Sequence, residues 1–194
     1  MSIGLWIAGA YLCGSIPFSV WLGRLFLRAE IRRFGDGNPG GTNVIRAGGT
    51  VLGMVVILLD ALKGLLPIVL ARNYGQLGSW PLTAVALAAI VGHAFTVFLG
   101  FRGGKAVAVT FGVWGGLTGW PTLLLLGGLL LAAYLLLTID GWAVMLTLCV
   151  LLAFLVAFDA GQTSLSVWLG NFLILAWKHR KDLKCRPGLK PWAR

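Results

Sequence analysis

Three short polar segments interrupt this apolar chain, and their residue types are suited to binding phosphate. They are a glycine-rich loop (Gly35–Arg46), a lysine turn (Phe101–Ala106) and a basic tail segment (Lys178–Asp182). Each combines cations with small or hydrogen-bonding residues, which is the chemistry that grips a phosphate group. If the three segments meet at one end of the fold, they form a single anion-binding site.

The glycine-rich loop can present both backbone and side-chain donors. Glycine tolerates positive φ and close approach, so consecutive N–H groups around Gly40 can form a nest for an anion. Asn38, Thr42 and Asn43 add polar side chains. Arg46 adds a planar guanidinium that suits phosphate. Taken alone, a flexible turn beside a membrane-surface arginine explains the same residues.

The lysine turn places Gly103, Gly104 and Lys105 just before an apolar segment. A helix N-terminus preceded by glycines is a favourable anion site, and a lysine there adds a point charge. The spacing differs from the nucleotide-binding P-loop, whose motif is GxxxxGK[ST]. The alternative is a plain turn whose lysine extends from an apolar helix to the membrane surface.

The tail segment offers a titratable pair. His179 can hydrogen-bond a substrate hydroxyl or phosphate, and Asp182 lies three residues later, on the same face of a helix. The other cations of the tail are typical of a stretch that binds anionic lipid. We therefore assign substrate chemistry to His179 and lipid binding to residues such as Lys181.

Three further ionisable residues lie inside apolar segments, where charge is costly and a functional role is the default interpretation. Asp60 and Lys63 share a helix face at a spacing of three residues, which favours a structural ion pair over catalysis. For His93 the sequence leaves two interpretations open. It either contacts substrate or donates one hydrogen bond to a neighbouring helix as a neutral side chain.

The composition indicates an integral membrane protein. Hydrophobic residues make up 58% and charged residues 11% of the chain, with a mean hydropathy of +0.89, whereas a soluble domain carries about 25% charged residues. Apolar runs recur from end to end, so we expect a single all-α polytopic domain over residues 1–194.

The formal net charge of +10 comes from cations that flank apolar spans, which favours anionic lipid or substrate over nucleic acid. The three cysteines have no metal-binding spacing, and we expect no disulfide, metal or cofactor.

Seven segments are candidates for transmembrane helices, each of which needs about 20 residues to cross the membrane. The expected spans are 3–23, 51–71, 80–100, 105–119, 121–138, 142–158 and 163–178. The fourth and seventh are short for a full crossing, so we expect them to be tilted or shielded by other helices. The first span has no cationic region before it, so we expect it to be retained rather than cleaved as a signal peptide.

The positive charges alternate with these spans. Among the 16 lysines and arginines, only Lys63 and Arg72 fall outside the first loop, the third loop and the C-terminal tail. These three regions lie on one side of a seven-span protein, and the positive-inside rule makes that side cytoplasmic. We expect the N-terminus outside, the C-terminus in the cytoplasm, and a site that faces the cytoplasm.

Together the polar segments resemble the motifs of the bacterial acyl-phosphate:glycerol-3-phosphate acyltransferase family. The glycine-rich loop is similar to the motif Gly-Ser-Gly-Asn-Pro-Gly-Ala-Thr-Asn-Val-x-Arg, and the tail segment to Arg-His-Arg-x-Asn. The stretch Gly92–Lys105 resembles the family's second motif almost residue for residue. Leu59–Gly64 and Gly14–Phe18 also resemble the family, so the likeness covers nearly the whole chain in the same order.

The resemblance implies an enzyme of phospholipid biosynthesis in the bacterial inner membrane. It transfers a fatty acyl group from acyl phosphate to the sn-1 hydroxyl of glycerol 3-phosphate, giving lysophosphatidic acid and phosphate. No Ser-His-Asp arrangement is evident, so we expect direct attack without an acyl-enzyme. The expected catalytic residues are Arg46, Lys105 and His179. The expected substrate-binding residues are Asn38, Gly40, Thr42, Asn43, His93, Gly103, Gly104 and Asp182. We expect a monomer whose partners are its two substrates and membrane lipids.

The sequence departs from the family motifs at several positions. Asp36 stands where the motif has serine, Asp182 where it has asparagine, and Ala106 where it has glycine. A carboxylate beside a phosphate site is repulsive unless it is protonated, paired or turned away. One alternative is therefore a divergent paralogue that uses another phosphorylated acceptor or binds lipid phosphate without catalysis. The other, an anion or lipid transporter, is disfavoured because the polar residues gather at one face rather than at the midplane.

Overall fold

The computed structural model describes residues 2–193, and this part of the chain is built from helices. The α-helices in this range are α1 (Ile3–Ser15), α2 (Phe18–Leu27), α3 (Gly41–Arg46), α4 (Thr50–Asn73), α5 (Ser79–Ala94), α6 (Val107–Thr118), α7 (Trp120–Leu136), α8 (Asp140–Ala157) and α9 (Gly161–Lys178). Short 3-10 turns are η1 (Ile31–Arg33), η2 (Val97–Leu99), η3 (Asp182–Lys184) and η4 (Pro191–Ala193).

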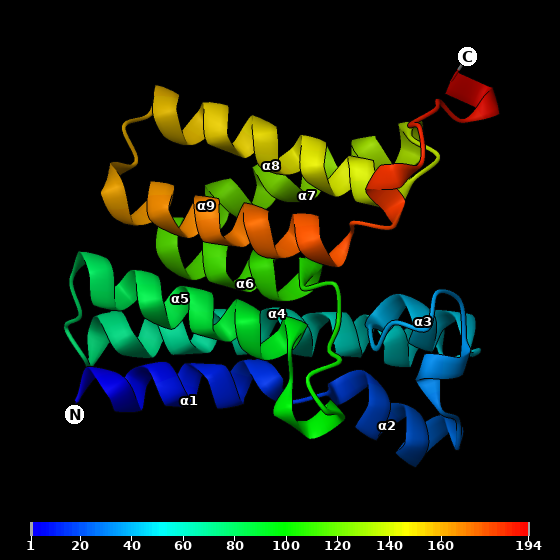
Figure 1. The fold of residues 1–194 in the computed structure, drawn as a ribbon, viewed down its shortest axis with the longest axis horizontal. Helices are drawn as coiled ribbons and strands as arrows, with labels where there is room; N and C mark the ends of the chain where they lie inside the picture. The colour runs from blue at the N-terminus through cyan, green and yellow to red at the C-terminus, as the bar shows by residue number, and fades with distance from the viewer. Residues whose placement is uncertain (1, 194) are drawn as a thin grey trace.

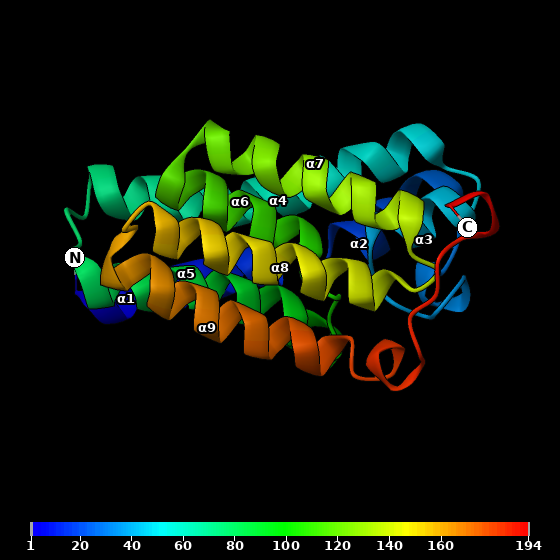
Figure 2. The same cartoon turned by 90° about the horizontal axis from the view of Figure 1, so that it is seen from above.

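The long helices cross the molecule in alternating directions (Figure 1). Helix α6 lies between a group formed by α1, α4 and α5 and a second group formed by α7, α8 and α9 (Figures 1 and 2). As a result, the glycine-rich loop, the lysine turn and the tail segment lie toward one end of the bundle, and the N-terminus lies at the other. The alternating path thus gathers segments that are far apart in the sequence.

The helices follow the expected spans, with two local differences. The first span is broken, because Pro17 lacks a backbone donor and restricts the residue before it, so α1 ends at Ser15 and α2 begins at Phe18. The third span leaves the α-helical conformation after Ala94 and ends in the turn η2. This early end of α5 places His93 in the last turn of the α-helix, next to the lysine turn.

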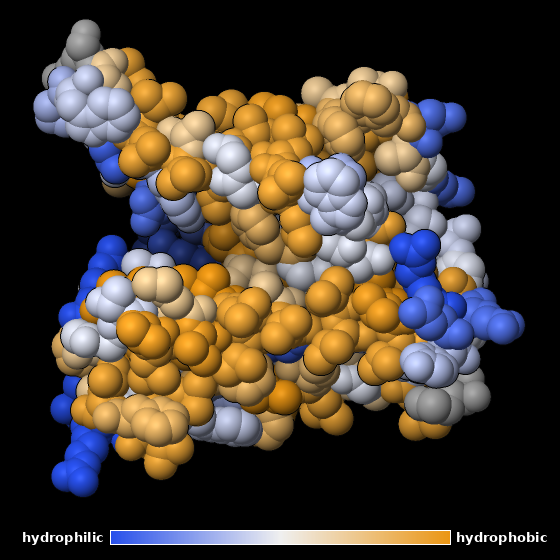
Figure 3. Space-filling view, turned by 180° about the vertical axis from the view of Figure 1, so that it is seen from behind, coloured by the Kyte–Doolittle hydropathy of each residue, from blue (hydrophilic) through white to orange (hydrophobic). Residues whose placement is uncertain are grey.

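The outer surface is suited to lipid. Four helical stretches are long and apolar enough to cross a membrane: Ile3–Leu27, Thr50–Asn73, Ser79–Leu99 and Asp140–Ala157. Helices α6 and α7 are apolar but shorter. Figure 3 shows mainly apolar side chains on the outside, an arrangement that indicates contact with acyl chains. The all-helical membrane fold is confirmed, whereas the number of crossings and the orientation stay predictions.

Glycines allow the inner helices to approach closely, as is common between membrane helices. At the α1–α5 contact, a Cβ on Gly14 would lie 2.1 Å from a carbonyl oxygen of α5, and one on Gly92 would lie 2.2 Å from a carbonyl oxygen of α1. At the α4–α6 contact, a Cβ on Gly112 would lie 1.7 Å from the carbonyl oxygen of Ala61. These contacts fix the helix positions that the site depends on.

We therefore predict that Gly112→Ala destabilises the protein, because the added methyl group forces α4 and α6 apart. Such overpacking lowers the free energy of unfolding by about 1–3 kcal/mol. Thermal unfolding in detergent micelles measures the effect. The matched control is Gly128→Ala in α7, where a Cβ has open space around it. Equal melting temperatures for the two variants would contradict the packing described here.

Candidate active site

A cavity of about 500 Å³ opens where the three polar segments meet. Polar residues of the three segments and apolar side chains from α4, α6 and α7 line it together. Figure 3 shows a hollow at this end of the molecule with hydrophilic atoms at its base. The predicted site residues in its wall are Asn38, Gly40, Thr42, Asn43, Arg46, His93, Lys105 and His179.

The glycine-rich loop is held by its own side chains. Gly35 and Gly37, on either side of Asp36, adopt positive φ of 56° and 76°. The Oδ1 atom of Asp36 accepts hydrogen bonds from the Asn38 backbone N–H (3.2 Å) and the Asn43 side-chain amide (3.0 Å). Asn43 also donates to the Asn38 carbonyl oxygen at 2.9 Å. The loop therefore has a defined shape rather than that of a flexible turn.

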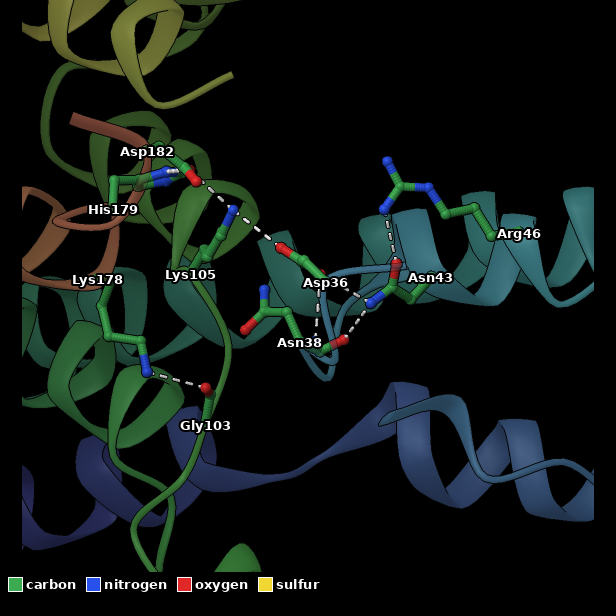
Figure 4. A network of polar contacts seen from close by, with 9 residues as sticks. All are labelled: Asp36, Asn38, Asn43, Arg46, Gly103, Lys105, Lys178, His179 and Asp182. Carbon is green, nitrogen blue, oxygen red and sulfur yellow. Dashed lines mark hydrogen bonds and ion pairs between the residues drawn. The ribbon is translucent and has the colours of Figure 1, made fainter. Parts of the chain in front are cut away.

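Asn43 connects this loop to Arg46. Its side chain is buried, and its Oδ1 atom accepts a hydrogen bond of 2.9 Å from Nη1 of Arg46 (Figure 4). One residue thus donates to Asp36 and accepts from Arg46, which orients the guanidinium at the cavity wall. The remaining donors of the Arg46 fork are free for a ligand as far as the described contacts show.

Lys105 joins all three segments. Its ammonium group lies 2.9 Å from Oδ2 of Asp36 in the glycine-rich loop and 2.9 Å from Oδ2 of Asp182 in the tail segment (Figure 4). The lysine side chain is 24% exposed, so the ammonium remains reachable from the cavity. Burial alone would lower the pKa of Lys105, but its hydrogen bonds to the two carboxylates raise that pKa above its ordinary value. Lys105 is therefore charged at neutral pH.

The two substituted carboxyl groups are ionised for the same reason. Burial alone would raise the pKa of Asp36, but hydrogen bonds from Lys105 and Asn43 lower it below its ordinary value. Burial would likewise raise the pKa of Asp182, but hydrogen bonds from His179 and Lys105 lower it. A carboxylate beside a phosphate site can be protonated, paired or turned away. In the structure both carboxylates are paired, and each forms an ion pair with Lys105.

Gly103 and Gly104 occupy a different role from the one their sequence suggests. Their backbone N–H groups donate to the carbonyl oxygens of Ala94 (3.2 Å) and His93 (3.0 Å), so these N–H groups are already used. A Cβ on Gly104 would lie 2.1 Å from Nε2 of His93. The pair packs the lysine turn against the end of α5 and does not line the cavity. The helix N-terminus that does line it belongs to α6, through Val107.

Beneath the site lies a buried charged cluster. Nζ of Lys63 is 2.7 Å from Oδ1 of Asp60 and donates to the carbonyl oxygen of Ile16 at 2.7 Å. This is the intrahelical ion pair that the spacing of these residues indicates. Nδ1 of His93 lies 3.8 Å from the same Asp60 oxygen, and both residues reach the cavity wall. The cluster ties α1, α4 and α5 together under the site.

His179 and Asp182 form a close pair at the end of α9. Nδ1 of His179 lies 2.9 Å from Oδ2 of Asp182, and the imidazole is 1% exposed. Burial lowers the pKa of His179, and the Asp182 carboxylate opposes that shift without cancelling it. His179 is therefore neutral at pH 7, with one ring nitrogen engaged by the carboxylate.

The structure adds residues that sequence reasoning did not assign to the site. Tyr134 and Asp140 line the cavity. Lys178, a cation of the basic tail segment, donates to the carbonyl oxygens of Ala94 and Gly103 at 2.9 Å each and so holds the lysine turn against α9. Only Asp140 carries a weak signal in the sequence, because the stretch Ile139–Ala143 around it has no serine where many members of the family that the polar segments resemble carry one. Tyr134 is a single aromatic residue in an apolar helix, so nothing in the sequence marks it as a site residue.

Known proteins are similar to this chain over most of its length. A family model described as glycerol-3-phosphate acyltransferase matches residues 4–185. A glycerol-3-phosphate acyltransferase of Geobacter metallireducens is 38% identical over 93% of this chain and 91% of the relative. One from Anaeromyxobacter dehalogenans is 51% identical, but that match spans 61% of this chain and only 61% of the relative's length.

The fold is also that of a solved enzyme. The crystal structure of PlsY, an integral membrane glycerol 3-phosphate acyltransferase, in its glycerol 3-phosphate form superimposes with a TM-score of 0.87 and 31% identity, over 95% of this chain and 91% of PlsY. Its lysophosphatidic acid form gives a TM-score of 0.83. The fold, the polar segments and these similarities show that the chain belongs to the glycerol-3-phosphate acyltransferase family.

Proposed function

We propose that this protein transfers a fatty acyl group from acyl phosphate to the sn-1 hydroxyl of glycerol 3-phosphate, releasing lysophosphatidic acid and phosphate. The observation that carries the proposal is a single cavity lined both by the cations Lys105 and Arg46 and by apolar side chains of α4, α6 and α7. The named activity of the relatives, and the PlsY forms with glycerol 3-phosphate and lysophosphatidic acid, support the same acceptor and product.

The polar part of the cavity suits two phosphate groups. Lys105 supplies a point charge, and Arg46 supplies a planar fork that can bind phosphate through two hydrogen bonds. The first N–H groups of α6 have no partner within their helix, and Val107 and Ala108 line the cavity. Together these groups neutralise charge without a metal ion or cofactor.

The apolar part of the cavity suits an acyl chain. Ile57 and Leu58 on α4, Phe111 on α6 and Leu130 on α7 line it. Burial of each methylene group contributes about 0.8 kcal/mol, so a long chain is held mainly by this wall. The reacting acyl carbonyl then lies where the apolar and polar parts meet, which orients it toward the acceptor hydroxyl.

The reaction needs little more than positioning and charge stabilisation. The sn-1 hydroxyl oxygen attacks the acyl carbonyl carbon, and the bond from that carbon to the phosphate oxygen breaks. The phosphate leaves with the bonding electrons, while Lys105 and Arg46 stabilise the charge that develops on it. The hydroxyl proton passes to a base, either the leaving phosphate or His179. No covalent acyl-enzyme is required.

The proposal includes the setting of the enzyme. Residues 1–194 act as one membrane domain and as a monomer in the bacterial inner membrane, with the cavity open to the cytoplasm.

An activity assay tests the proposed reaction. Purified protein is assayed with palmitoyl phosphate and glycerol 3-phosphate, and both phosphate release and lipid product are measured. Acyl coenzyme A and acyl carrier protein serve as alternative donors. If the acyl group is transferred from either of these donors and not from palmitoyl phosphate, acyl phosphate is not the donor.

The pairing of Asp36 and Asp182 with Lys105 favours one alternative, a paralogue that accepts a different phosphorylated polyol. Two carboxylates near the anion site penalise a highly charged acceptor. The same assay with other polyol phosphates tests this alternative. A higher kcat/KM for one of them than for glycerol 3-phosphate would change the assigned acceptor while leaving the donor in place.

Lys105→Ala should remove most of the transferase activity. The ammonium group is the cation that contacts both flanking segments, and loss of one such stabilising group lowers kcat/KM by about 10²- to 10³-fold. The matched control is Lys181→Ala, an exposed tail lysine outside the cavity, which should keep wild-type activity. Circular dichroism checks that both variants are folded. Wild-type turnover in Lys105→Ala would remove this lysine from phosphate binding.

Asp36→Ser should preserve or raise the activity toward glycerol 3-phosphate. A serine oxygen can still accept from the Asn38 backbone N–H, but it is too short to reach the Lys105 ammonium. The Asp36 carboxylate is 42% exposed, so release of its ion pair is worth at most about 1 kcal/mol, or about fivefold in KM. Steady-state kinetics measure the change. A large loss of kcat would assign Asp36 a role of its own.

Cys185 provides a native probe of orientation, because it is exposed in the tail. In a Cys13→Ser, Cys149→Ser background, a membrane-impermeant maleimide should label Cys185 in inverted vesicles but not in intact cells. The positive-inside distribution of cations is the physical reason. Ser79→Cys in the same background, at the start of α5 and the opposite end of the bundle, should label with the reverse pattern. Labelling of Cys185 from outside the cell would overturn the topology.

A further inference from the structure

The end of the chain folds back onto the turn that joins α7 to α8 (Figures 1 and 2). An antiparallel β-bridge pairs Leu137 in this turn with Leu189. At the start of α8, Nε1 of Trp142 donates to the Cys185 carbonyl oxygen at 2.9 Å. Residues 185–190 thus form a C-terminal strap that is fastened to this part of the fold at both of its ends.

One residue of the strap, Lys190, caps the C-terminal end of α7. Its backbone N–H donates to the Leu136 carbonyl oxygen at 2.8 Å, and its Nζ donates to the Tyr134 carbonyl oxygen at 2.6 Å. The last four carbonyl groups of an α-helix have no partner within the helix, and a cation is favoured at this end of the helix dipole. The last turn of α7 is therefore held by a residue that comes 56 positions after Tyr134.

The capped turn carries Tyr134 into the cavity. Tyr134 lies four residues after Leu130, so the two side chains share a face of α7, and both line the cavity. Tyr134 is half-buried, and its hydroxyl makes no hydrogen bond to the described residues. Tyrosine combines an apolar ring with a polar tip. It can therefore pack against an acyl chain and donate a hydrogen bond to the same ligand.

The position of Tyr134 along α7 indicates which part of a ligand it meets. It is nearer than Leu130 to the α7–α8 turn, and the start of α8 contacts the tail segment, because a Cβ on Gly141 would lie 2.5 Å from the Asp182 Cβ. The hydroxyl of Tyr134 is thus on the side of the polar segments, and Leu130 is one turn farther from them. This order suits an acyl phosphate whose oxygens lie near Tyr134 and whose chain extends past Leu130.

We propose that Tyr134 is a specificity-determining residue for the acyl donor, and that Lys190 is the positioning residue that holds it in the cavity wall. The inference rests on the proposed function. The ring of Tyr134 contacts the acyl chain, and its hydroxyl donates a hydrogen bond to an oxygen of the acyl phosphate group. The cap supplied by Lys190 fixes the backbone from which this side chain projects.

This role separates Lys190 from the other cations of the tail. Lys181 and Lys184 are exposed, as expected for lysines that contact lipid headgroups. Lys190 is half-buried and donates inward to a helix end instead. The family model matches residues 4–185, so the bridge and the cap are made by residues outside the matched region.

Amide hydrogen exchange tests the cap without any turnover. The Thr138 N–H donates to the Gly188 carbonyl oxygen at 2.9 Å, so the strap covers the end of α7 directly. Deletion of residues 188–194 should speed exchange at Thr138 and in the last turn of α7, and Lys190→Ala should speed exchange in that turn. The matched control is Lys184→Ala, which should exchange like the wild-type protein. Unchanged exchange at the end of α7 in the shortened protein would reject the cap.

Kinetics with both substrates test the role of Tyr134. Lys190→Ala and Tyr134→Phe should each raise the KM for palmitoyl phosphate by about 2- to 10-fold, the range expected for one hydrogen bond. The KM for glycerol 3-phosphate should keep its wild-type value, because the three polar segments lie outside α7. Lys190→Arg should restore the KM for palmitoyl phosphate, since a guanidinium group can donate to the same carbonyl oxygen. A general loss of stability would not separate the two KM values.

A double-mutant cycle decides whether Lys190 acts through Tyr134. Tyr134→Ala removes the side chain that the cap positions, so adding Lys190→Ala should raise the KM for palmitoyl phosphate no further. Additive effects of the two substitutions would overturn the proposal, and so would an equal rise in both KM values.

Equilibrium binding of palmitoyl lysophosphatidic acid gives the same cycle without catalysis. A wild-type protein that binds this lipid and shows the non-additive cycle, but transfers no acyl group, would reject the proposed function. The roles of Tyr134 and Lys190 in binding an acyl lipid would then stand. A dissociation constant that neither Tyr134→Ala nor Lys190→Ala changes would reject those roles, whatever the activity of the protein.

Discussion

The site depends on one ammonium group that is shared by two carboxylates. Lys105 lies between Asp36 and Asp182, which are 146 residues apart in the numbering, at 2.9 Å from each. Without this lysine, the carboxylates of Asp36 and Asp182 would lie near each other without a shared cation and would repel one another. The lysine therefore does more than offer a charge to a ligand. It also contacts the two other polar segments of the site.

The partial exposure of this interaction suits it to substrate exchange. Ion pairs that contact water contribute about 1 kcal/mol or less, so a phosphate group that binds with several hydrogen bonds can replace a carboxylate on Lys105. The deeper pair of Asp60 and Lys63 is different, because both side chains are almost fully buried. Breaking a buried pair by removing one partner is strongly destabilising. The site thus combines a buried, fixed ion pair of Asp60 and Lys63 with partly exposed ion pairs of Lys105 that a ligand can replace.

The apolar scaffold makes this arrangement possible. Closely packed glycines such as Gly92 and Gly112 bring helices near enough for short loops to meet at one end. The break between α1 and α2 at Pro17 and the early end of α5 leave carbonyl oxygens exposed to the interior, and Lys63 and Lys178 donate to such groups. Irregular backbone is tolerated at membrane depth only where protein groups satisfy it in this way.

Much of the fold and the location of the site followed from the sequence alone. Runs of apolar residues and the placement of cations are local signals, so the helices and the gathering of three polar segments at one end could be predicted. The interaction partners of the site residues could not be predicted in this way. That Asp36 and Asp182 share Lys105, that the N–H groups of Gly103 and Gly104 are used by α5, and that Tyr134 reaches the cavity all depend on contacts between elements distant in the chain. Hydrogen bonds are decided over fractions of an ångström by the packing of helices against one another, and that packing exists only in the folded protein.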